Sequence, residues 1–187
     1  MVDNKFRVEN LNTPNKPMDN PHLISKKSMS AWATTAGKSS DRQTYHEIFT
    51  KINNAKTKSG KTEVLLEHDS EPLRMLLKGA FDPSIKWDLP DGVPPYKANE
   101  APTGTQHTWL IDESKKLWHF LVGGNPGLSK ARKETMFIQV LENLSKEESA
   151  LLINIKDKKL NKVYKGLTAN LVKDAFGWNE NFMRQNA

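Results

Sequence analysis

The feature that most constrains this chain is the three- and four-residue spacing of its apolar side chains beyond residue 44. This spacing places them on one face of a helix, whereas a half-buried strand would need alternation at every second residue. The first such stripe consists of Tyr45, Ile48, Phe49 and Ile52. Strand-like alternation is almost absent, so the pattern predicts a mainly α fold built as a compact multi-helix domain.

Residues with short polar side chains precede most of these stripes. Such side chains accept hydrogen bonds from the free N–H groups of a first helical turn. The residues predicted to begin helices in this way are Ser40, Ser70, Asp112, Ser129, Ser145 and Thr168. A short helix is also expected over about 61–68 and another over 115–122. Ser145 with Glu148 matches a capping box, and Gly177 is predicted to end the last helix.

Two segments break the helical pattern. Residues 1–40 form a predicted extended basic tail, because prolines interrupt it and its apolar residues are isolated. Trp32 is its one tryptophan, and it is predicted to bind a partner, unless it packs back on the domain. The domain itself is assigned to 41–187, with a long proline-rich loop over 82–111. Aromatic residues within this loop predict that it wraps around the helices.

Charge and composition limit the classes of function. There are 28 Lys and Arg residues against 22 Asp and Glu residues, so the net charge is +6 and DNA, RNA or an anionic surface is a favoured partner. Cysteine is absent, which excludes disulfides, thiolate zinc sites and cysteine nucleophiles. No run approaches the roughly 18 apolar residues of a membrane helix. We therefore expect a soluble intracellular protein with no membrane partner.

Catalytic motifs are matched only in part. Ser59-Gly60-Lys61-Thr62 ends like a phosphate-binding P-loop, but Ala55 stands where that motif requires glycine. His46-Glu47 begins like a zinc motif, but Thr50 replaces its second histidine. No nucleophile elbow is present. These departures predict a protein with no enzymatic activity, no metal and no cofactor.

A cluster of lysines is the first feature that indicates nucleic-acid binding. Asp157 is the only acid among residues 156–166. The basic residues of this segment are Lys156, Lys158, Lys159, Lys162 and Lys165, and Gly166 follows them. Positive charges packed this closely repel one another unless an anion or water screens them, so phosphate contacts are predicted at these six residues. A solvated helix end is the alternative.

The second such feature is the start of the helix that follows Ser129. Its first turn carries Lys130, Arg132 and Lys133, which is the wrong sign of charge for the positive end of a helix dipole. A bound anion would reverse this cost, so these four residues are predicted to converge on one phosphate. Compensation by Glu134 and solvent is the alternative. Aromatic residues are too few for a base-stacking platform, which favours a DNA duplex over a single strand.

Several segments resemble the helical DNA-binding domain of ATP-dependent DNA ligases. They are Phe-Thr-Lys-Ile-Asn-Asn at 49–54, Glu-Pro-Leu-Arg-Met-Leu-Leu-Lys-Gly-Ala-Phe-Asp-Pro at 71–83, Lys158-Lys159-Leu160 and Tyr164-Lys165-Gly166-Leu167. The resemblance covers about 45–178 and implies a grip on the duplex backbone in the minor groove. The Lys-x-Asp-Gly nucleophile of the ligases appears nowhere, so the resemblance implies DNA binding without catalysis.

The chain also resembles a family of uncharacterised proteins from tailed bacteriophages. The similarity lies in Trp87-Asp88-Leu89-Pro90, Glu134-Thr135-Met136-Phe137-Ile138-Gln139 and Ala175-Phe176-Gly177-Trp178-Asn179. It implies a phage source, and hence the host cytoplasm or the virion as location.

Three functions remain open from the sequence. The leading hypothesis is a phage accessory protein that binds double-stranded DNA without sequence specificity. The second is a virion or assembly protein whose tail and loop order on neighbouring subunits. The third is an adaptor or inhibitor of a replication or transcription protein, with Trp32 as its anchor.

Overall fold

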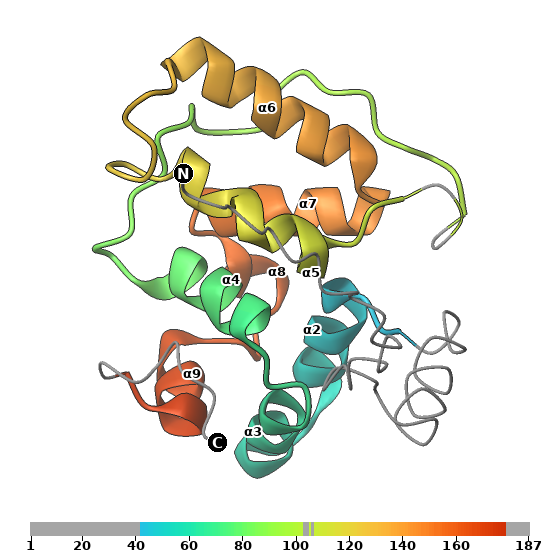
Figure 1. The fold of residues 1–187 in the computed structure, drawn as a ribbon. Coiled ribbons are helices and arrows are strands. Elements are labelled where there is room, and N and C mark those ends of the chain that lie inside the picture. The colour runs from blue at the N-terminus through green and yellow to red at the C-terminus, as the bar shows by residue number, and fades with distance from the viewer. Residues whose placement is uncertain (1–41, 103–104, 106, 179–187) are drawn as a thin grey trace, which may run out of the picture. The chain divides into compact units, whose positions relative to one another are not determined.

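The computed structural model describes residues 42–102, 105 and 107–178, and within them every regular element is a helix (Figure 1). The α-helices are α2 (Tyr45–Asn54), α3 (Lys58–Glu67), α4 (Glu71–Phe81), α5 (Leu110–Glu113), α6 (Lys130–Asn143), α7 (Lys146–Lys156), α8 (Leu160–Val163) and α9 (Ala169–Phe176). A 3-10 helix, η1 (Ser114–Phe120), continues directly from α5. The predicted mainly α fold is confirmed. No described helix has the length and apolar character needed to cross a membrane.

Helix α7 lies at the centre of the domain and contacts α2, α4, α6 and α8, while α9 packs on α3 (Figure 1). The apolar stripes read from the sequence face this centre. Phe49, Leu77 and Leu152 come from three different helices, and each is fully buried in one continuous core. The stripe of α6 also enters it, because Phe137 packs edge-on against Phe120 of η1 with ring centroids 5.3 Å apart.

The caps predicted at Ser70, Ser129, Ser145 and Thr168 are confirmed, since each hydroxyl accepts a bond from the backbone N–H three residues later. The helix that carries Tyr45, Ile48, Phe49 and Ile52, α2, instead begins after Thr44, whose side chain forms a capping box with Glu47, so the prediction that Ser40 caps it was wrong. The second helix begins at Lys58, earlier than expected, because Thr57 caps it.

Glu148 explains two further differences from the predicted helix starts. Its side chain is 2% exposed and does not fold back on Ser145. Instead its carboxylate accepts hydrogen bonds from the N–H of Tyr45 (3.3 Å) and the N–H of Leu110 (3.0 Å), the first residues of α2 and α5. One carboxylate thus caps two distant helices, and α5 begins at Leu110 with Asp112 inside it. Burial raises the pKa of Glu148, and the bonds from Leu110 and Tyr45 oppose this rise.

The loop between α4 and α5 follows the surface of the helices, as predicted. Trp87, Leu89 and Tyr96 pack against the core, although Val93 stays 72% exposed. The loop is also held by its backbone, because the N–H of Gly92 donates to the Asp157 carboxylate at 3.2 Å. The domain boundary expected at residue 40, the tail and Trp32 lie outside the described residues and stay predictions.

Candidate nucleic-acid interface

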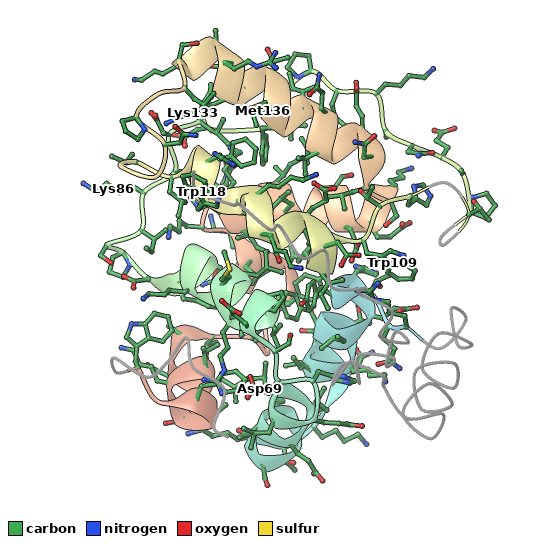
Figure 2. All side chains as sticks on the ribbon, viewed as in Figure 1. Asp69, Lys86, Trp109, Trp118, Lys133 and Met136 are labelled. Carbon is green, nitrogen blue, oxygen red and sulfur yellow. The ribbon has the colours of Figure 1, made fainter. Side chains whose placement is uncertain are left out.

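The lysines at the start of α6 are paired with a carboxylate of the same chain, Asp88. Lys133, labelled in Figure 2, lies near the start of α6. Its Nζ is buried and donates to the Asp88 carboxylate at 2.8 Å. The Lys130 Nζ lies 3.9 Å from the same carboxylate. The hydrogen bond from Lys133 lowers the pKa of Asp88. Asp88 therefore occupies the place predicted for a phosphate.

The other members of that predicted phosphate site do not complete it. The Ser129 hydroxyl is engaged as the helix cap, accepting from the N–H of Arg132 at 3.3 Å. The Arg132 side chain is exposed and has no ion pair among the described residues. Lys133 is neutralised by a carboxylate that lies 45 residues away in the sequence, so its ammonium group is already bound, and the convergence of the four residues on one external anion stays a prediction. Arg132 is the member that remains open to solvent.

Lys156 ends α7 as a buried structural residue. Its Nζ donates to the Pro90 carbonyl at 2.7 Å and contacts the Asp157 carboxylate. The Lys159 Nζ binds the second oxygen of that carboxylate at 3.0 Å, and its side chain is half exposed. Burial opposes ionisation of Asp157, but the bonds from Lys156 and Lys159 outweigh it and lower the pKa of Asp157. The charges of Lys156 and Lys159 therefore face the Asp157 carboxylate of the same chain.

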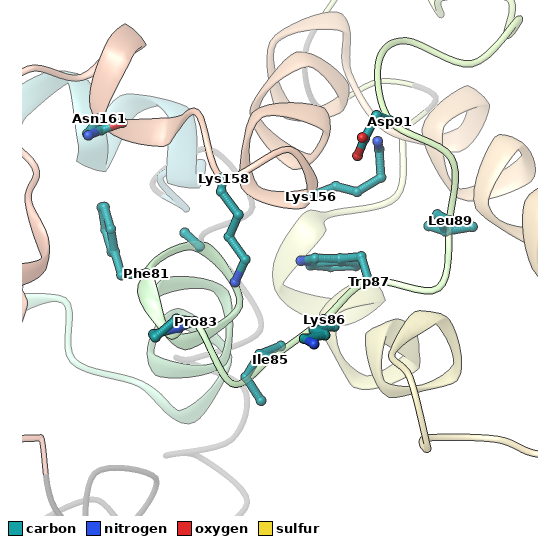
Figure 3. A pocket seen from close by; sticks show the side chains of 11 residues that line it. Phe81, Pro83, Ile85, Lys86, Trp87, Leu89, Asp91, Lys156, Lys158 and Asn161 are labelled. Atoms are coloured by element: carbon teal, nitrogen blue, oxygen red, sulfur yellow. The ribbon is translucent and has the colours of Figure 1, made fainter.

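Lys158 reaches from the end of α7 to the last turn of α4 (Figure 3). Its Nζ donates to the carbonyls of Gly79 (2.6 Å) and Asp82 (2.8 Å). A cation at this place satisfies free carbonyls and the negative end of the helix dipole. The residue adopts a positive φ of 57°, which directs the chain from α7 into α8. Burial lowers the pKa of Lys158, with nearby Asp82 opposing that effect.

The remaining predicted residues lie together at the connection from α8 to α9. Lys162 and Lys165 are exposed, and neither ammonium group has a hydrogen-bonding or ionic partner in the described part of the chain. The N–H of Gly166 donates to the Asn53 side-chain carbonyl at 3.2 Å, which fixes this turn to the end of α2. A Cβ on Gly166 would clash with the Lys61 Nζ and lie 3.3 Å from the Asn53 Cα.

Lys61 is the basic residue that the sequence did not assign to this place. It lies in the first turn of α3, within the segment that resembles a P-loop, so that segment is helical rather than a phosphate-binding loop. Because residue 166 is a glycine, there is room beside it for the ammonium group of Lys61. We call Lys61, Lys162 and Lys165 the lysine patch. In the sequence, Gly166 after Lys165 was the one signal that another group comes close to this turn. That this group is the Lys61 side chain could be found only from the structure.

The described residues contain no cluster of three acidic or histidine side chains that could hold a metal ion. His46, from the incomplete zinc motif, pairs its Nδ1 with the Tyr164 hydroxyl at 2.8 Å instead. This contact joins α2 to the turn that carries Lys165. Burial raises the pKa of Tyr164 to about 12, so its hydroxyl stays protonated at neutral pH and can donate to the imidazole.

Comparisons with known proteins give one match. No curated protein and no solved structure matched the chain. Residues 48–162, more than half of the chain, match the model of a family described only as a family of unknown function, DUF6433. The match runs from α2 through α8 and includes Lys61, Asp88 and Glu148. On this evidence the chain belongs to the family of unknown function DUF6433.

Proposed function

We propose that this protein is a non-catalytic accessory protein that binds double-stranded DNA through the phosphate backbone, with the lysine patch as its contact surface. The observation that supports this most is the contrast between the patch and the other predicted lysines. Lys156 and Lys133 are buried against carboxylates, whereas Lys162 and Lys165 are exposed with no described partner. Cations of this second kind can exchange water and counterions for phosphate at little cost.

The shape of the turn favours a backbone contact over base recognition. Because Gly166 has no side chain, the Lys61 ammonium group can lie against the turn that carries Lys165, which adds its positive charge to that turn. The Gly166 N–H is already bound to Asn53, so the lysine ammonium groups would supply the attraction. Lysine is a flexible point charge without the planar fork that arginine uses to recognise guanine. We therefore expect little sequence specificity.

The resemblance to the ligase DNA-binding domain supports the same surface. The matching stretch Tyr164-Lys165-Gly166-Leu167 forms the turn between α8 and α9, and Lys165 within it belongs to the patch. We propose on this basis a duplex contact at the turn. The similarity to tailed-phage proteins supports a phage source and a role in the host cytoplasm or virion, which belongs to the same proposal.

Not every residue predicted from the sequence stays in the proposed interface. We omit Lys133, Lys156 and Lys158, because each ammonium group is already bound inside the domain. Lys159 and Arg132 are exposed enough to add to the positive field of the protein, and Lys130 is 81% exposed along its side chain. These three are secondary contributors, and the lysine patch is the centre.

The test is binding of the full chain to a fluorescently labelled duplex at low ionic strength. The Lys162→Glu/Lys165→Glu variant should bind about tenfold or more weakly, because each reversal removes one attraction and adds one repulsion. The matched control is Lys115→Glu/Lys146→Glu, which makes the same change in net charge at exposed lysines of η1 and of the first turn of α7. Equal losses in both variants would show that net charge alone matters. No binding by the wild-type chain would remove the proposal.

A further inference from the structure

Two hollows adjoin on the face formed by α4, η1 and the loop after α4. The first is an apolar groove of about 180 Å³, whose walls include Met75, Ile85, Trp87, Leu117, Trp118 and Leu121. The second is a basic hollow of about 520 Å³ (Figure 3). Its lysines are Lys86, Lys156 and Lys158. Ile85 and Trp87 line both hollows and form the wall between them.

The backbone makes this wall firm. The loop segment 86–88 pairs antiparallel with 120–122, since the Asp88 N–H donates to the Phe120 carbonyl (2.7 Å) and the Val122 N–H donates to the Lys86 carbonyl (2.9 Å). The Trp87 indole N–H also donates to the Gly79 carbonyl at 3.3 Å. The groove is thus formed between elements that are already bound to one another, and a ligand would not have to order them.

The surface at the groove is unusually apolar for a solvent-facing site. Trp118 is 43% exposed and forms part of the wall, and Val122, next along the chain from Leu121, is 62% exposed. An aromatic side chain at the edge of an apolar groove is typical of a protein-binding surface. A cavity of about 150 Å³ lined by apolar side chains is large enough for a benzene ring. The groove can therefore take one large apolar side chain.

The charge of the basic hollow favours a negatively charged ligand. Its lining has three lysines and one carboxylate, Asp91. Lys156 is neutralised by Asp157, and Lys158 binds backbone carbonyls, which leave its positive charge in place. Lys86 is exposed and forms no ion pair with a described residue. Lys78, in the wall of the apolar groove, adds a further cation.

From this pairing we infer that the face docks an acidic amphipathic segment of a partner protein. One large apolar side chain of the segment fills the groove, and a carboxylate beside it lies against Lys86 at the basic hollow. The inference goes beyond DNA binding and does not depend on it, because no residue of the lysine patch lines either hollow. It assigns the chain a protein-recruiting surface with a defined chemistry.

The test uses the full chain and a fluorescent synthetic helical peptide with Leu and Phe at positions i, i+3, i+4 and i+7 and Glu elsewhere, a pattern suited to groove binding. Peptides with Lys in place of Glu, or Ser in place of Leu and Phe, should bind at least about tenfold more weakly, equivalent to about 1.4 kcal/mol. Equal binding of the acidic and basic peptides, or no binding of the acidic one, would overturn the inference.

Protein variants locate the site. Lys86→Glu and Trp118→Ser should each weaken the acidic peptide about tenfold, whereas Leu66→Ser, a matched change at an exposed apolar residue of α3, should not. Unchanged thermal unfolding of the variants shows that the fold persists, since both side chains at the site are exposed. A DNA-binding surface is the competing outcome. If duplex DNA displaces the peptide, and Lys86→Glu weakens DNA as much as Lys162→Glu, the docking inference fails.

Discussion

Replacing Glu148 with alanine removes the acceptor of two helix starts at once. The N–H groups of Tyr45 and Leu110 would lose their partner in a place where water does not reach them, since the Glu148 side chain is 2% exposed. Each buried donor left without a partner costs about 1–3 kcal/mol. We expect the free energy of unfolding to fall by about 2–6 kcal/mol, which lowers the melting temperature by roughly 4–24 °C in a chain of this size.

Urea unfolding at neutral pH, followed by circular dichroism, measures this loss. Glu148→Gln is the informative companion, because its side-chain carbonyl keeps one of the two acceptors, while its NH2 group cannot accept from the second backbone N–H, so it should lose part of the stability that Glu148→Ala loses. Glu147→Ala changes the exposed neighbouring residue of α7 and should be nearly neutral. If Glu148→Ala matches Glu147→Ala, the double-cap account of this carboxylate is wrong.

The tight contact at Gly124 and the shifted pKa values of three carboxylates should also have measurable effects on stability. Gly124→Ala would place its Cβ against the Trp118 carbonyl and should destabilise the chain by about 1–3 kcal/mol in urea, whereas Gly127→Ala meets only the Asn125 side chain at 3.4 Å and should be tolerated. Asp82 and Asp157 have lowered pKa values, so their contribution is full above the usual value of 3.8 and is lost as the pH falls through their folded values. The pKa of Glu148 is raised, so its contribution to stability is full below pH 4.5 and is lost as the pH rises through its pKa in the folded protein. A pH series of unfolding midpoints should show this loss at the higher pH in the wild-type chain. The Glu148→Gln variant, which has no group that titrates there, should not show it.

Local chemistry in the sequence was sufficient for most of the fold. The spacing of apolar residues and the caps at Ser70, Ser129 and Thr168 predicted real helices, because both signals depend on residues within one or two turns. The start of the helix after Trp109 was missed for the opposite reason. Its cap comes from Glu148, 38 residues farther along, and no local pattern at Asp112 contains that information.

The candidate site shows the same division. The lysines of 156–165 were correctly seen as a cluster in sequence, but the fold separates them by function. Lys156 and Lys158 bind Pro90 and Gly79, which lie 66 and 79 residues away. Lys61 comes from another helix to join the turn at Gly166. These long-range contacts decide which ammonium groups are already bound, and the pattern of charge along the sequence does not contain that information.

The salt dependence of duplex binding tests the central proposal most directly. Three lysines that each neutralise one phosphate predict that log K falls with log salt with a slope of about −2 to −3, from roughly −0.9 per phosphate. Neutralising all three in the Lys61→Gln/Lys162→Gln/Lys165→Gln variant should leave only the small slope of the secondary contributors and a nearly unchanged melting temperature. A wild-type slope near zero, or a variant with the full wild-type slope, would contradict binding of the DNA backbone by the lysine patch.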